Sequence, residues 1–357
     1  MKTKPLVAVL KTTPQTVLQD YEKLMHLAEY EKFLSNKIET IIKLNLSWSL
    51  YYPACSTEPW QLDGVLGTLR KDGYKKIRAV ENKTVVTNPV KGARDNNWIP
   101  VLQKHGLKFE PLQGMKWDVY KPRHELDAIP HIFPEGLKIP VMFKDKNVVH
   151  LPTIKTHGHT TMTGAMKNAF GGLITEHRHH CHKMIHEVLV DLLQIQQEIH
   201  PGIFAVMDGT VCGDGAGPRT MVPKIKNYIL ASNDQVAIDA ISAKMMGYDP
   251  LKIPFIKIAH DKGLGCGDVD QIEIVGEQID NVNFNFTTGK SPIIAGDQLF
   301  RKGALSFIEP LLFHTPLFKL CIFASAFYHD YLWYPTVGRK YIGQFMKTQW
   351  GELFQQY

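Results

Sequence analysis

Seven of the sixteen histidines of this 357-residue chain lie within one stretch of thirty residues. Histidine changes its charge near neutral pH and is the commonest metal ligand, so the cluster indicates proton transfer, metal binding or both. A solvated run of histidines without chemistry is the alternative. The seven residues are His157, His159, His177, His179, His180, His182 and His186.

Three residues of this segment are the candidates for catalysis: His157, Lys167 and His182. His157 follows an apolar run at 147–151 that is typical of a buried strand, and open α/β sheets place their ligand sites at the carboxyl ends of strands. Lys167 lies among the small residues of 164–172, which let a ligand approach the backbone closely. It could clamp a phosphate or carboxylate, act as a covalent nucleophile, or simply face solvent.

The spacing of His182 and His186 predicts that they share one helix face, where they could hold one metal ion. The predicted metal ligands are these two residues together with His157 and His179. Zinc, nickel and iron are the candidate metals, and the cofactor is otherwise unknown. The zinc-protease pattern H-E-x-x-H does not occur.

Further polar residues are expected to bind the substrate or cofactor, because they follow predicted strands or flank the histidines. Asp208 ends one such strand and is followed by a glycine-rich segment at 213–217, which is expected to form a loop that could cradle an anion or serve as a tight turn. No nucleotide-binding glycine motif is present. The binding candidates are Lys43, Asn45, Lys155, His159, Asn168 and Asp208.

The elements that position these residues alternate between strand and helix, which predicts an α/β fold with a mostly parallel sheet flanked by helices. The expected strands are 6–10, 39–46, 77–81, 107–112, 147–151, 203–208, 227–231 and 271–275. The expected helices are 14–34, 59–71, 96–105, 184–199, 235–246 and 250–262. We divide the chain into an N-terminal α/β lobe (1–130), a C-terminal α/β lobe with the histidines (131–280) and an aromatic-rich extension (281–357). The site would lie between the two lobes, although both could share one sheet.

Net charge, cysteine content and the N-terminal residues indicate which partners, cofactors and cellular compartment to expect. The net charge of +6 is spread along the chain, which makes nucleic acid an unlikely partner and fits a small anionic substrate. Five scattered cysteines without a C-x-x-C pair indicate a reducing compartment and no iron–sulfur cluster in this chain. The N-terminus lacks the pattern of a signal peptide, so we expect a cytoplasmic protein.

The C-terminal extension contains eight aromatic residues between Phe313 and Tyr334. Its most apolar run, Leu317 to Tyr328, is too short to span a bilayer. The alternatives are packing on the body, packing on a second subunit of a homo-oligomer, or peripheral contact with a membrane.

The order of motifs resembles the domain-of-unknown-function family 362 over roughly residues 5–277. The motifs are Ile42–Asn45, Leu151–His157, Gly164–Gly172, Asp208-Gly209 with Gly217-Pro218, and Ser232–Ala240. Many members of that family carry a ferredoxin-like cluster domain. The resemblance therefore implies a second function, that of a metal-binding or redox accessory protein with a separate electron-transfer partner.

The spacing of His157, Lys167 and His182 is more distantly similar to the nickel-pincer lactate racemase family. That likeness implies a lysine that tethers the cofactor, with histidines as nickel ligands or as the acid/base pair. This chain has Gly164-Ala165-Met166 before the lysine, where that family has Gly-Gly-x. From the histidines we expect an enzyme, isomerase-like or oxidoreductase-like, that transfers a proton or hydride on a small-molecule substrate.

Overall fold

A computed structural model describes residues 4–175, 178–301, 303–313 and 315–357. Its centre is a ten-stranded, mostly parallel sheet in the order β12-β1-β11-β10-β7-β2-β3-β4, with β8 and β9 attached to β10. The α/β fold predicted from the sequence is confirmed. The strands of this sheet are β1 (Leu6–Lys11), β2 (Thr40–Lys43), β3 (Ile77–Glu81), β4 (Phe109–Pro111), β7 (Asn147–His150), β8 (Thr153–His157), β9 (Thr161–Met162), β10 (Ile203–Ala216), β11 (Thr220–Ser232) and β12 (Glu273–Gly276).

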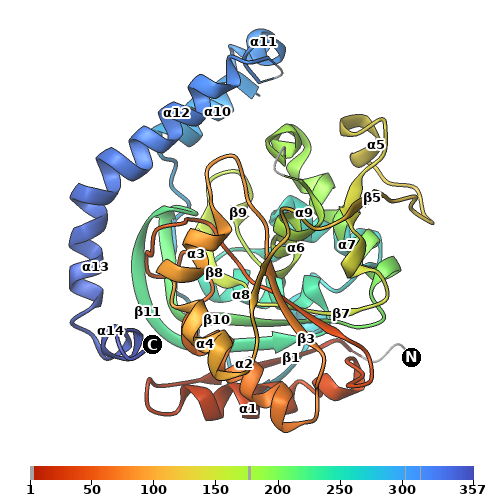
Figure 1. Ribbon diagram of the computed structural model, residues 1–357, viewed down its shortest axis with the longest axis vertical. Helices are drawn as coiled ribbons and strands as arrows, with labels where there is room; N and C mark the ends of the chain where they lie inside the picture. Colours follow the sequence, from red (N-terminus) through yellow and green to blue (C-terminus); the bar gives the residue numbers. More distant parts are fainter. Residues whose placement is uncertain (1–3, 176–177, 302, 314) are drawn as a thin grey trace.

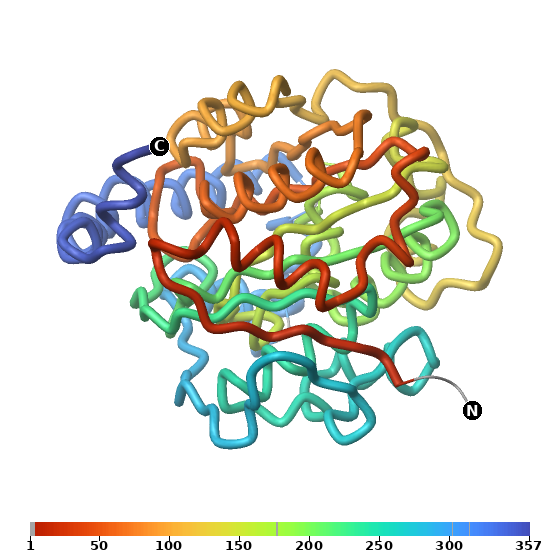
Figure 2. The backbone as a smooth tube through the Cα atoms, turned by 90° about the horizontal axis from the view of Figure 1, so that it is seen from below, coloured from red at the N-terminus to blue at the C-terminus, as the bar shows by residue number. Residues whose placement is uncertain are grey.

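Helices cover both faces of the sheet because successive strand residues point to opposite sides. Ile41 and Met207 belong to one hydrophobic core, under α6, α7, α8 and α9, whereas Ile42 and Val206 belong to the other, under α1, α2 and α4. Figures 1 and 2 show the sheet between these two layers. The helices are α1 (Val17–Leu27), α2 (Pro59–Lys71), α3 (Pro89–Asp95), α4 (Trp98–Lys104), α6 (Ala165–Leu173), α7 (Ile185–Ile199), α8 (Gln235–Met246) and α9 (Pro254–Asp261).

Strands from both predicted lobes pair within this sheet. β7 lies between β2 and β10, in parallel register with both. The irregular segment between Trp117 and Pro140 holds a small hairpin, β5 (Trp117–Val119) and β6 (Lys138–Pro140), and the short helix α5 (Ile129–Ile132).

One local prediction is wrong. The glycine-rich segment after Asp208 does not form a loop, because β10 continues to Ala216 and pairs with a long antiparallel β11. The small residues around Lys167, for which the sequence pattern predicted no element, form the helix α6. The short side chains in both segments allow close packing, and pairing or capping from distant residues decides the conformation.

The C-terminal extension forms an arm beside the body, coloured blue in Figure 1. It consists of α10 (Pro292–Arg301), α11 (Glu309–Phe313), α12 (Phe318–Ala326), a π-helix η7 (Phe327–Gly338), α13 (Arg339–Phe345) and α14 (Gln349–Phe354). Among the described residues no single helix has the length and composition needed to cross a membrane, but Ser306–Phe313 and Phe318–Phe345, bent by 90°, meet those criteria as a pair.

Hydrogen bonds and ring contacts of aromatic side chains hold η7 and α14 against the body. Trp48 Nε1 donates a hydrogen bond of 2.7 Å to Asp330 Oδ1, and Tyr334 OH donates one of 2.9 Å to the carbonyl of Tyr51. Trp350 of α14 packs on Trp60, with ring centroids 5.0 Å apart. The extension therefore packs on the body along the part that includes η7 and α14.

Candidate functional site

Lys167 is positioned by the first turn of α6, which a buried carboxylate from α8 caps. Asp239 accepts hydrogen bonds from the backbone N–H groups of Ala165 and Met166, at 2.6 and 3.1 Å. Glycine at position 164 permits this approach, since a Cβ there would lie 2.2 Å from Asp239 Oδ1. Burial raises the pKa of Asp239 to about 7, against the opposing effect of these two hydrogen bonds.

The Lys167 ammonium lies in a cationic environment. Its Nζ is 5.3 Å from the centre of the Phe170 ring, and among the described residues it forms no ion pair. Removal from water, followed by the positive charges of Arg178 and Lys155, lowers the pKa of Lys167 to about 7. A bound anion would reverse this effect by supplying the missing counter-charge.

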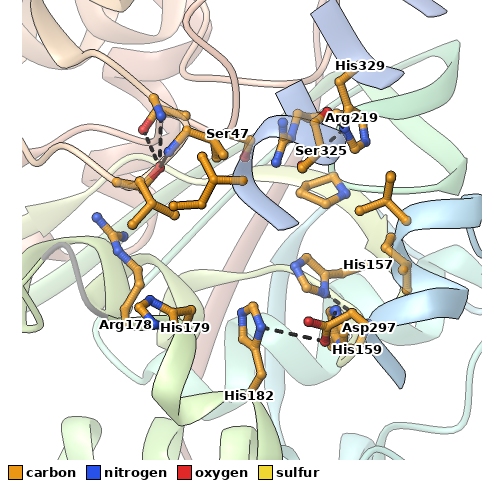
Figure 3. Close-up of a pocket in the computed structure, with 18 of the residues that line it drawn as sticks. Ser47, His157, His159, Arg178, His179, His182, Arg219, Asp297, Ser325 and His329 are labelled. Carbon is orange, nitrogen blue, oxygen red and sulfur yellow. Dashed lines mark hydrogen bonds and ion pairs between the residues drawn. The ribbon is translucent and has the colours of Figure 1, made fainter. Parts of the chain in front are cut away.

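Two of the predicted histidines meet a carboxylate that the sequence did not reveal. His159 Nε2 lies 3.7 Å from Asp297 Oδ2, and His182 Nδ1 lies 3.9 Å from the same oxygen. The His159 and His182 rings are stacked at 4.8 Å. Figure 3 shows the three side chains converging, with His157 beside them.

This group has the donors and spacing of a metal site. One ligand atom from each of His159, His182 and Asp297 lies within 4.8 Å of the other two. Metal bonds of about 2.0–2.1 Å in tetrahedral geometry place ligand atoms about 3.4 Å apart, so small side-chain rotations would complete the set. Three protein ligands leave a fourth position for water or substrate, as in catalytic zinc sites.

Asp297 is held in place by Arg301, one turn later on α10. The Nε of Arg301 donates to both carboxylate oxygens at 3.0 Å, and the guanidinium lies 3.7 Å above the ring of Phe313. These contacts direct the carboxylate at the histidines.

His157 is buried next to this group at the end of β8. Its Nδ1 accepts a hydrogen bond of 3.2 Å from the backbone N–H of His159, and the two rings are 5.8 Å apart. Burial lowers the pKa of His157, and the nearby charge of Lys167 lowers it further. The imidazole is therefore neutral near pH 7, and because Nδ1 accepts this hydrogen bond, its proton lies on Nε2.

These residues line a cavity of about 410 Å³ between the body and the arm. The body side carries most of the polar groups, and the arm side contributes Asp297 and Arg301 together with apolar groups such as Phe318 and Ile322. Figure 3 shows Ser325 and His329 of the arm across the cavity from His182. Among the described residues, five cationic side chains and two carboxylates line it: Lys43, Lys167, Arg178, Arg219 and Arg301, with Glu81 and Asp297.

Three of the predicted binding residues, Lys43, Asn45 and Asn168, also line the cavity. The Lys43 ammonium is buried in an ion pair with Glu81, at 2.8 Å, which neutralises its charge. Asn168 Nδ2 donates to the carbonyl of Lys43 at 2.9 Å, and so ties α6 to the end of β2.

Lys155 and Asp208 lie in the interior and do not line the cavity. The Asp208 carboxylate accepts hydrogen bonds from Tyr21 OH at 2.7 Å and from Trp60 Nε1 at 3.0 Å. Lys155 Nζ donates to Asn45 Oδ1 at 2.8 Å, and burial lowers its pKa to about 8. Asp208 therefore serves the core, whereas Lys155 contacts the site through Asn45 and acts on Lys167 through its charge.

The remaining histidines lie outside the group of possible metal ligands among the described residues. His179 lines the cavity and stacks on Phe318 of the arm at 3.9 Å. His186 packs against Phe255 of α9, with ring centroids 6.1 Å apart, and it is not part of the group formed by His159, His182 and Asp297. A short 3₁₀ segment, Arg178–Met184, precedes α7 and breaks the helical spacing on which the pairing of His182 with His186 was predicted. His177 lies outside the described residues.

Sequence reasoning missed Asp297, Arg178 and Arg219. Asp297 is 115 positions beyond His182 in a segment without histidines, so no local spacing connects it to the cluster. Its placement four residues before Arg301 on an amphipathic helix was the available signal.

Comparison with known proteins gives a family and two distant likenesses. A thylakoid-associated protein of Synechocystis sp. is 25% identical over 215 residues, which cover 59% of this chain and 63% of that relative, so this chain spans less than two thirds of it. A Thermotoga maritima protein of known crystal structure shares 9% identity at a TM-score of 0.38, over 59% of this chain and 53% of that chain. The family model described as domain of unknown function DUF362 matches residues 40–244. The chain therefore belongs to the DUF362 family.

Proposed function

We propose that this protein is an enzyme that uses a divalent metal ion to transfer a proton on an anionic small molecule. The observation that supports the proposal is the meeting of His159, His182 and Asp297 in a cavity with surplus positive charge. These ligands come from the β8–β9 turn, the segment before α7, and α10. Side chains from three separate elements meet at this point. A solvated run of histidines without chemistry would not require such a meeting, so the convergence favours a functional site.

Each group that lines the cavity would have a separate role in the proton transfer. A metal ion held by the three ligands would polarise a carbonyl or hydroxyl oxygen of the substrate and so acidify the neighbouring C–H bond. His157, neutral and adjacent, would accept that proton at Nδ1, in place of the hydrogen bond from the His159 N–H, and return it. Lys167 and Arg219 would bind the anionic group of the substrate.

The cavity also indicates the shape of the substrate. Its cationic groups other than Arg301 of α10 lie on the body side, whereas Phe318 and Ile322 of the arm present apolar surface to the same space. Such a cavity fits a molecule with an anionic head and an apolar part, because each part meets a wall of matching polarity.

Metal analysis of purified variants tests the ligand set. The protein is stripped with a chelator, reloaded separately with zinc, nickel and iron, and analysed by mass spectrometry. We expect H159A, H182A and D297A to lose one equivalent of metal, since each removes one of three ligands. H186A is the matched control and should retain it. Metal loss in H186A, or no metal bound by the parent protein, would contradict the proposal.

Proton transfer is tested independently by exchange with heavy water. The metal-loaded protein is incubated in D₂O with a panel of 2-hydroxy and 2-oxo acids that differ in chain length. We expect deuterium incorporation next to the functional group, strongly reduced in H157A. A metal-binding protein that catalyses no exchange and that accepts electrons from a reduced ferredoxin would instead support the accessory role.

A further inference from the structure

The outward side of the arm is an apolar stripe. Leu320, Phe323, Phe327 and Tyr331 are 63%, 69%, 53% and 73% exposed. Their spacing of three or four residues along α12 and η7 places them on one side of the helix. Phe307 and Leu311, at 76% and 58% exposure, extend the apolar surface toward α11. A soluble monomer rarely leaves a stripe of this size open to water.

The opposite side of the same helix is apolar as well. Phe318 and Ile322 line the cavity, together with Cys321 and Ser325. A helix that is apolar all round normally lies in a protein core or in lipid. Here the body covers the inner side, and among the described residues nothing covers the outer one.

Charge around the stripe is one-sided. Between residues 318 and 347 the cations are Lys319, Arg339, Lys340 and Lys347, all exposed. The single carboxylate in that interval, Asp330, accepts the hydrogen bond from Trp48 and is directed at the body. An apolar stripe flanked by exposed cations is the pattern of helices that lie in the interface of an anionic membrane.

We propose that the outer side of the arm docks the protein on an anionic lipid surface as a peripheral contact. A symmetric dimer through the same stripe would place identical cationic flanks against each other, since a two-fold interface pairs a patch with itself. Anionic lipid supplies the opposite charge and the apolar layer together. This inference is independent of the proposed chemistry, because it uses side chains that face away from the cavity.

Vesicle sedimentation tests the proposal with the full chain. The probes are vesicles of phosphatidylcholine alone and of phosphatidylcholine mixed equally with phosphatidylglycerol. We expect the parent protein to sediment with the mixed vesicles and much less with the neutral ones. The variant L320Q/F323Q/F327Q should bind the mixed vesicles at least about tenfold more weakly, because three apolar side chains no longer enter the interface.

The matched control places three glutamines at exposed apolar positions of the body, L18Q/V90Q/V119Q, which are 39%, 53% and 41% exposed. It should sediment like the parent. Circular dichroism and metal content of the arm variant report whether the fold and the His159 site persist. Unchanged sedimentation of the arm variant would overturn the proposal. So would a parent protein that ignores vesicles but forms dimers that the arm variant breaks.

Discussion

The two walls of the cavity differ in how they are built. The body wall consists of the ends of β2 and β8 and the start of α6, with side chains held by buried caps and ion pairs. The arm wall is a single layer of helix, covered on one side and exposed on the other. The DUF362 model matches residues 40–244 and therefore the body wall. Asp297 and the apolar surface come from outside the matched segment, so this chain's own extension completes the site.

Among the predictions, the largest expected change is in the free energy of unfolding when a glycine of each wall is replaced by alanine. A Cβ at position 164 would lie 2.2 Å from Asp239 Oδ1, whereas at Gly296 of α10 nothing lies within 4 Å. We expect G164A to lower the free energy of unfolding by about 2–3 kcal/mol, because the cap of α6 must shift. G296A should leave it unchanged or raise it by up to about 1 kcal/mol, since alanine favours a helix over glycine.

Denaturant unfolding followed by circular dichroism measures both changes. If G164A were as stable as the parent, α6 would tolerate movement relative to α8, and the contrast between a tightly packed body wall and an open arm wall would fail. Metal content of the same two variants adds a second readout, which should fall in G164A only if α6 also orders the histidines.

The contrast between the walls also explains what the sequence could predict. Alternating apolar runs and turn residues identify the α/β class and most strands, and histidine density identifies the body wall. The pairing of β10 with β11 beyond Asp208 depends on contacts between strands, which a local pattern does not contain. Asp297 was missed for a similar reason. The contact between α10 and the histidines forms only in the tertiary structure, and no local sequence pattern encodes it. The predicted His182–His186 pair assumed regular α-helical spacing, whereas His182 lies in a 3₁₀ segment directly before α7.

The pH dependence of anion binding should distinguish the lysine of the body wall, Lys167, from its arginine, Arg219. The pKa of Lys167 is lowered to about 7, so its ammonium loses its proton as the pH rises through that value. We expect the affinity of the metal-free protein for sulfate to fall by about tenfold between about pH 6 and pH 9, since sulfate itself stays divalent. K167M should remove most of this dependence. R219Q should weaken binding at every pH, because a guanidinium keeps its proton throughout.

Calorimetric titration with sulfate across this pH range measures the effect. The sign is set by the lysine: its cationic form, which attracts the anion, is the form present below pH 7. A K167M variant with the parent's pH dependence would show that another group controls binding, and would leave Lys167 without a role on the body wall.

The attachment of the arm gives the smallest expected effect. Trp48 is 1% exposed, and its indole N–H donates to Asp330 of η7. W48F removes this hydrogen bond and keeps most of the ring packing against Trp333 and Tyr334. We expect a loss of about 1 kcal/mol in the closed position of the arm, which corresponds to about fivefold faster local opening.

Hydrogen–deuterium exchange of the peptides from α12 to α13 reports that opening, while peptides from β2 and β8 serve as the internal reference. Y328F is the matched control, since it changes an aromatic residue of η7 whose hydroxyl forms no hydrogen bond with the described residues. Faster exchange in the arm with an unchanged body would mean that the arm wall opens as a unit while the body wall stays closed. Equal acceleration in both would mean that the walls unfold together, and the contrast drawn between them would not hold.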